Sequence, residues 1–123
     1  MVQWVPPALL LELAADDEGL IFELVDAFKV DTAARLQQIR LALTSTDHSR
    51  LKREVHTIKG AAKQVGADLV AALCQDIERE IAEDPAKPLD GRIEELESQF
   101  EEAWHAMARY EELHSAPSAP SRL

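Results

Sequence analysis

The chain has 123 residues, and 23 acidic against 13 basic side chains give it a formal net charge of −10. That balance argues against binding to a nucleic-acid backbone or an anionic membrane surface, because both need a basic face. Hydrophobic residues make up 46% of the chain, too many for a disordered acidic tail. No apolar run could span a bilayer, and the first residues lack the features of a secretory signal. We therefore expect one cytoplasmic domain.

The pattern of breakers and apolar residues predicts an all-α chain. No proline occurs between Pro7 and Pro85, and aromatic residues make up only 5%, which leaves little for strands. Apolar spacing predicts helices over about residues 7–15, 17–43, 48–65, 68–83 and 90–114. Asp16 or Asp17, and later Asp47, are the expected N-caps, and Gly66 is the expected stop of the third helix.

Each long helix has an apolar face that is expected to point inward. The expected inward residues are Ile21, Leu24, Val25, Phe28, Thr32, Leu36, Ile39 and Leu43; Leu51, Val55, Ile58, Ala62 and Val65; Leu69, Leu73, Ile77 and Ile81; and Ile93, Leu96, Phe100, Ala103, Met107 and Tyr110. Such helices joined by short loops predict an antiparallel up-down-up-down four-helix bundle over residues 1–114, with a short extra N-terminal helix. Residues 115–123 are expected to form a flexible Ser/Pro-rich tail, and Cys74 is expected to be a buried, unreactive side chain.

The third predicted helix differs from the rest of the chain in charge. Between Arg50 and Lys63 lie five cations and one acid, which is +4, whereas the remaining residues carry −14. At about 100° per residue, His56 lies roughly 140° from Leu51, the reference for the apolar face, and so points outward. Lys52, Lys59 and Lys63 also lie outside the apolar face, and Gly60 lies on the side opposite the core. An exposed helical glycine costs about 1 kcal/mol relative to alanine, so we interpret it as room for something bulky beside His56.

This combination suits a reversible phosphoryl acceptor. A neutral imidazole is a nucleophile, and an ordinary pKa of about 6.5 leaves most histidine side chains neutral at pH 7. Nearby lysines, here expected to be exposed, can neutralise the charge of a phosphoryl group. Phosphoryl transfer depends mainly on positioning and charge stabilisation, so a partner protein could supply the remaining groups and the metal.

The segment His56-Thr57-Ile58-Lys59-Gly60, followed by Gly66, resembles the H-x-x-K-G-x5-G signature of histidine-containing phosphotransfer (HPt) domains. The likeness extends over about residues 4–113. It implies a phosphocarrier, not an enzyme: His56 accepts phosphate from a receiver-domain aspartate or a kinase and passes it to another receiver aspartate. Lys59 would stabilise the phosphoryl charge, Gly60 would admit the partner, and Gly66 would be structural.

The resemblance also implies the partners and a further site residue. The expected partners are response-regulator receiver domains and a sensor or hybrid histidine kinase, docked with help from Lys52, Arg53 and Lys63. Mg²⁺ is expected on the receiver, with no cofactor or metal on this chain, and the chain is expected to be a monomer. If the helices on either side of Gly66 fold back on each other, His56 faces residues 76–78. Glu78 is then a candidate carboxylate to orient the imidazole, and the favoured alternative is that it belongs to a solvated face of an acidic helix.

Two other readings remain open. Glu102-x-x-His105 and Glu111-x-x-His114 have the spacing of di-metal carboxylate proteins, but they lie on one helix and on opposite faces, which disfavours a metal centre. His48 has no partner at ligand spacing and is expected on the surface. The stronger alternative is a non-catalytic helical adaptor that docks an acidic partner through the basic side of the third helix.

Overall fold

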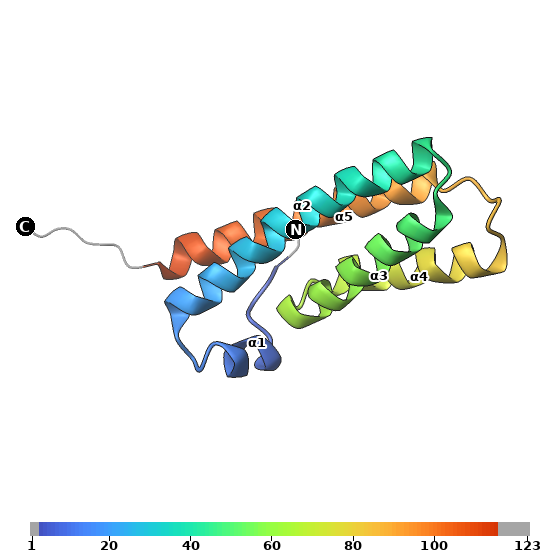
Figure 1. The fold of residues 1–123 in the computed structure, drawn as a ribbon. Helices are drawn as coiled ribbons and strands as arrows, with labels where there is room; N and C mark the ends of the chain where they lie inside the picture. The colour runs from blue at the N-terminus through green and yellow to red at the C-terminus, as the bar shows by residue number, and fades with distance from the viewer. Residues whose placement is uncertain (1–2, 116–123) are drawn as a thin grey trace, which may run out of the picture.

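The computed structural model describes residues 3–115, and within them all regular structure is helical (Figure 1). Five helices follow one another in the chain: α1 (Ala8–Leu13), α2 (Glu18–Thr44), α3 (His48–Val65), α4 (Asp68–Glu83) and α5 (Asp90–His114). The all-α prediction is confirmed, and the predicted boundaries of the four long helices hold to within a residue or so. Residues 116–123, most of the predicted tail, lie outside the described part of the chain.

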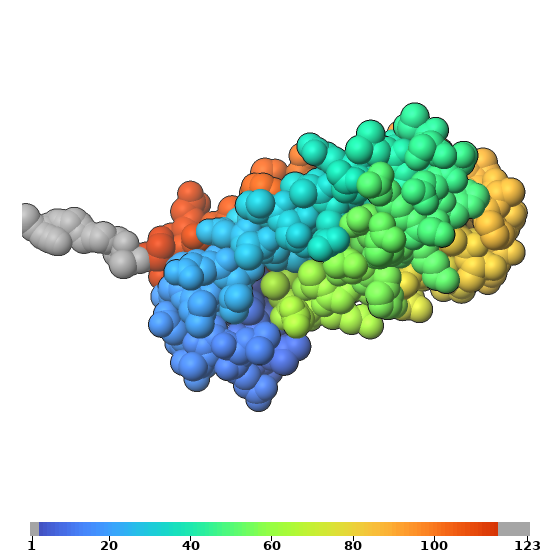
Figure 2. Space-filling model, viewed as in Figure 1, coloured from blue at the N-terminus to red at the C-terminus, as the bar shows by residue number. Residues whose placement is uncertain are grey.

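The four long helices form a ring in which each packs against its two neighbours in the order α2, α3, α4, α5. Successive helices run in opposite directions, as the up-down-up-down prediction requires (Figure 1). The helices α2 and α5, with 27 and 25 residues, project beyond α3 and α4, with 18 and 16. The short α1 packs against α3 at this projecting end, so that it forms a lobe beside the start of α2 (Figure 2).

Local capping fixes where α2 and α3 begin and where α3 ends. The side chain of Asp17 accepts a hydrogen bond from the backbone N–H of Leu20, and Asp47 does the same for Arg50, each at 3.1 Å. Gly66 ends α3 in the left-handed conformation with φ 75°. A Cβ there would also lie 3.0 Å from the ring of Pro7, so the α3–α4 turn fits the segment before α1 closely. Glycine is therefore required at this turn both for its backbone angle and for its small size.

Most of the predicted apolar faces form the core. Cys74 is fully buried, and burial raises the pKa of its thiol to about 12, which fits an unreactive packing residue. Leu24, Leu43 and Tyr110 are half-buried at the edge of the core. The prediction for Leu69 is wrong, since its side chain is 56% exposed and Val70 is buried instead. Counting back from Ile77, seven residues turn the helix by about −20° and eight by about 80°, so Val70 keeps the inward direction and Leu69 loses it.

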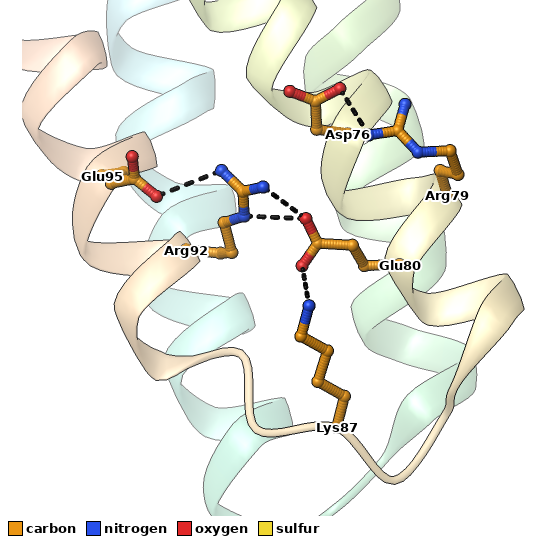
Figure 3. A network of polar contacts seen from close by, with 6 residues as sticks. All are labelled: Asp76, Arg79, Glu80, Lys87, Arg92 and Glu95. Atoms are coloured by element: carbon orange, nitrogen blue, oxygen red, sulfur yellow. Dashed lines mark hydrogen bonds and ion pairs between the residues drawn. The ribbon is translucent and has the colours of Figure 1, made fainter.

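The α4–α5 connection is held by a buried carboxylate (Figure 3). Glu80 accepts hydrogen bonds from Arg92 Nε at 2.8 Å and from Lys87 Nζ at 3.1 Å. Arg92 lies in the first turn of α5 and Lys87 in the loop before it. These two cations hold the pKa of the Glu80 carboxyl below its ordinary value of 4.5, although burial opposes them. Glu80 therefore ties the loop and the start of α5 to α4.

Candidate functional site

The outward direction predicted for His56 is confirmed. Its side chain is 68% exposed, while Val55 and Ile58 on either side of it are completely buried. Four residues further along α3, Gly60 is exposed, and a Cβ built on it would meet no atom within 4 Å apart from its own helix. Close packing therefore does not explain this glycine, and the helix surface next to the imidazole is left flat.

One nitrogen of the His56 ring, Nδ1, is hydrogen-bonded to a residue of the neighbouring helix. Glu78 on α4 places Oε2 2.7 Å from His56 Nδ1, the contact proposed from the fold-back of the two helices. Burial alone would raise the pKa of the Glu78 carboxyl, but hydrogen bonding and charge from Lys59 and His56 outweigh it, so the pKa lies below 4.5. An ionised carboxylate can only accept a hydrogen bond, so Nδ1 must carry the proton. In the neutral ring the lone pair then belongs to Nε2, the nitrogen on the far side from Glu78.

The prediction that Lys59 is exposed is wrong. Its side chain is only 16% exposed, because it lies along α4 instead of extending into solvent. The ammonium lies 2.6 Å from Glu78 Oε1 and donates a hydrogen bond of 3.1 Å to Gln75 Oε1. The two oxygens of Glu78 therefore hold the imidazole and the ammonium group together. A long lysine stem can follow an apolar surface in this way, whereas a helical wheel gives only the direction of its first bonds.

Gln75 is the one residue of this cluster that the sequence analysis did not identify. His56 and Glu78 each lie eleven residues from Ala67 in the α3–α4 turn, and Lys59 and Gln75 each lie eight residues from it. The counting that made Glu78 a candidate therefore also places Gln75 opposite Lys59. The same count from the α3–α4 turn, started from Lys59 instead of His56, predicts the contact between Lys59 and Gln75.

The other basic side chains of α3 surround the site without entering it. Lys52, Arg53 and Lys63 are exposed, as is His48 at the start of the helix. The single acid of this helix, Glu54, is buried and accepts a 2.9 Å hydrogen bond from Arg35 of α2. Because that carboxylate faces the bundle, the exposed surface of α3 is more strongly positive than its net charge indicates.

The residues that have the spacing of a di-metal carboxylate site do not meet in the interior of the bundle. Glu102, His105 and His114 are exposed and Glu111 is half-buried, all of them on α5. Within residues 3–115, no group of three or more His, Cys, Asp and Glu side chains is arranged to hold a metal ion. In the same part of the chain, no helix combines the length and the apolar character that crossing a membrane requires.

An all-helical bundle in which an exposed imidazole has a carboxylate and a lysine behind it has the arrangement of a histidine phosphotransfer protein. The Hpt domain family model matches residues 23–113, so the chain belongs to the Hpt domain family. The chain is thus a histidine phosphotransfer component of two-component phosphorelay signalling, and its partners are of the two-component kind, kinases and receivers. The resemblance inferred from the motif around His56 is confirmed.

Two solved structures share the fold. Histidine-containing phosphotransfer protein B (HptB) from Pseudomonas aeruginosa PAO1 is 24% identical, with a TM-score of 0.77 over 89% of this chain and 96% of that one. The HPT domain of an Hpt sensor hybrid histidine kinase from Shewanella is 23% identical, with a TM-score of 0.69 over 88% of this chain and 93% of that one. None of the curated protein sequences compared with this chain matches it.

Proposed function

We propose that His56 is the residue that carries the phosphoryl group, and that Nε2 is the nitrogen that bonds to it. The observation that carries this proposal is the exposed ring whose Nδ1 is held by the ionised Glu78. The Nε2 lone pair attacks the phosphorus of a partner's aspartyl phosphate. A P–N bond forms while the P–O bond breaks, and the aspartate leaves as a carboxylate with the electron pair. The Nδ1 proton stays in its hydrogen bond to Glu78, and transfer to the next receiver reverses these steps.

Lys59 and Glu78 have separate parts in this step. Glu78 is a positioning residue, because it acts on the phosphoryl group only through His56 and Lys59. The Lys59 ammonium lies one helical turn from His56, where it neutralises charge that develops on the transferred phosphoryl oxygens. Its support by Gln75 and Glu78 keeps the long side chain ordered in the absence of phosphate. The motif resemblance and the cluster geometry both support these roles.

The remaining roles concern the partner. Gly60 lets a receiver's active site approach the imidazole, and the exposed Lys52, Arg53 and Lys63 attract its acidic surface. The receiver supplies Mg²⁺ and the other catalytic groups, so this chain acts as a phosphocarrier and needs no cofactor of its own. One copy suffices for transfer, in keeping with the proposed monomer. The cytoplasmic location stays a prediction.

The test incubates the full chain with a phosphorylated receiver domain and Mg²⁺, with ³²P label on the receiver. We expect label on this chain that is stable in base and lost in acid, as for a P–N bond. His56→Gln removes the label. His48→Gln is the matched control, because it makes the same change on an exposed histidine of the same helix and should leave the label intact.

Two outcomes would contradict the proposal. Label that persists in His56→Gln means another residue carries the phosphoryl group. Wild-type protein that stays unlabelled with several receivers, yet binds them through α3, supports the adaptor reading. Lys59→Ala tests the charge role, since it should slow transfer by about tenfold with a folded protein, whereas unchanged transfer would remove Lys59 from the mechanism.

A further inference from the structure

The face of the bundle between α2 and α5 contains an open hollow of about 430 Å³. Leu36 from α2 and Phe100 and Trp104 from α5 give it an apolar lining. Because α2 and α5 are adjacent in the helical ring and α3 and α4 form the other half, the hollow lies on the side of the bundle away from His56, which contacts α4 through Glu78. Nothing in the phosphotransfer site accounts for it.

Trp104 is the main exposed aromatic side chain of this hollow and is held in a fixed position. It is 37% exposed, and its ring packs edge-on against Phe100 with the centroids 5.6 Å apart. The ammonium of Lys29, a side chain that is itself almost fully buried, lies 5.4 Å from the centroid of the indole ring. A large aromatic group that is already ordered loses little conformational entropy on binding, which is why such residues dominate binding energy at interfaces.

The two edges of the hollow differ in character. Two exposed apolar side chains of α2 lie one helical turn from residues that line the hollow: Val30, 70% exposed, is three residues before Ala33, and Leu41, 55% exposed, is four residues after Gln37. Along α5 the edge is acidic, with Glu94, Glu97 and Glu101 spaced by three and four residues on one side of the helix. Arg40 from α2 binds Glu97, but among residues 3–115 Glu101 forms no ion pair. A binding segment would therefore meet apolar side chains on one edge and carboxylates on the other.

We infer that this hollow and its edges dock a cationic amphipathic helix of a partner protein. The apolar stripe of such a helix fits over Leu36, Phe100 and Trp104, and its lysines or arginines lie beside Glu94 and Glu101. Charge selects this occupant over a second copy of the chain. Eight acids against two arginines give α5 a charge of −6, within a chain of −10, so two copies of this face repel each other.

Docking at this surface is compatible with transfer at His56. The two sites use different pairs of helices, so one molecule can hold the basic helix and a receiver at the same time. The basic α3 attracts acidic proteins and the acidic α5 attracts basic ones, which separates the two kinds of partner by charge. The surface therefore gives the carrier a means of being held near other components of its pathway.

The probe is a fluorescein-labelled synthetic peptide of about 18 leucines and lysines, with leucine on one helical face, and binding is measured by anisotropy at physiological salt. We expect saturable binding that Glu101→Arg weakens by about tenfold. Glu112→Arg, an equal charge change at an exposed position near the end of α5, should weaken binding by less than about twofold. Leu41→Ser should weaken it more than Leu113→Ser, since both leucines are exposed but only Leu41 lies one helical turn from a residue that lines the hollow, Gln37.

Several results would overturn this inference. They are the absence of saturable binding, an equal loss in both arginine variants, and peptide-induced NMR shifts confined to α3 and α4. A wild-type dimer in sedimentation that Glu101→Arg dissociates would assign the face to a second copy instead. Phosphotransfer to His56 is measured in the same variants and should not change, so failure of this surface is distinguishable from failure of the proposed function.

Discussion

Glu78 and Glu80 lie two residues apart on α4 and point to opposite sides of it, about 200° apart around the helix. Glu78 faces α3, where it holds His56 and Lys59, and Glu80 faces the loop and α5, where it holds Lys87 and Arg92 (Figure 3). The pKa of each carboxyl is lowered by these partners. One partner of Glu78 is the exposed imidazole proposed to carry the phosphoryl group, whereas both partners of Glu80 are cationic side chains that hold the loop and the start of α5. The α3–α4 side is thus the side proposed for phosphoryl transfer, and the α4–α5 side joins two helices of the fold.

The largest expected difference between the two sides comes from a pair of glycines. Gly60 on α3 and Gly91 at the start of α5 are both exposed, and a Cβ on either meets nothing within 4 Å. Gly60→Gln should slow phosphotransfer by about 100-fold, because the new side chain blocks approach to His56. Unfolding of this variant should need roughly 0.5 kcal/mol more, since glutamine favours helix over glycine.

Gly91→Gln is the matched control and should leave the transfer rate unchanged. Transfer rates from a labelled receiver and urea denaturation measure the two effects separately. A Gly60→Gln variant that is fully active would exclude the access role, and one that is both active and destabilised would mean that Gly60 serves packing.

The next largest effect is expected from removing the positioning carboxylate. Glu78→Ala should slow transfer by about tenfold, because the imidazole loses the acceptor that keeps the proton on Nδ1 and Lys59 loses its counter-charge. Glu78→Gln keeps an acceptor for Nδ1 and should recover much of the rate. NMR of the ¹⁵N-labelled imidazole should show mainly the Nδ1–H form in the wild type and a mixture of tautomers in Glu78→Ala. Equal tautomer populations in both proteins would leave Glu78 with no orienting role.

Removing Glu80, the carboxylate on the α4–α5 side, should lower the stability of the fold and leave the rate of phosphotransfer unchanged. Glu80→Ala removes the acceptor for both Arg92 and Lys87 and should lower the Tm by about 5 °C. The transfer rate at a temperature where the variant is folded should stay within about twofold of wild type. Thermal unfolding and the labelled-receiver assay test both statements. A large loss of transfer in folded Glu80→Ala would show that the two sides of α4 are coupled.

The smallest expected effect is on the pH dependence of stability, to which Glu78 and Glu80 both contribute. Because the pKa of each is lower in the folded protein than its ordinary value of 4.5, each stabilises the fold fully above about pH 4.5. As the pH falls below that value, the unfolded chain takes up protons first, so stability is lost until the pH passes the lowered pKa. Glu78→Gln and Glu80→Gln should each make the fall of Tm between pH 6 and pH 3 shallower than in the wild type. Parallel curves for all three proteins would contradict these pKa shifts.

Several parts of the site could be predicted from sequence because they depend on a single helix. The outward direction of His56 follows from the apolar face that includes Val55 and Ile58, and Asp47 and Gly66 mark the ends of the helix. Glu78 became a candidate through the simplest tertiary argument, the fold-back at Gly66. The helical wheel of α3 places Lys59 in solvent, because it does not include the neighbouring helix along which a long side chain can lie.

The sequence by itself determined the helices, their ends and the face that carries the histidine, since these depend on interactions among residues a few positions apart. Only the tertiary structure decided that Glu78 holds both His56 and Lys59, and that Trp104 lines a hollow on the opposite side. Contacts between helices depend on how far each is rotated and how closely the two approach. Those quantities are set by packing of the whole core, and no local pattern encodes them.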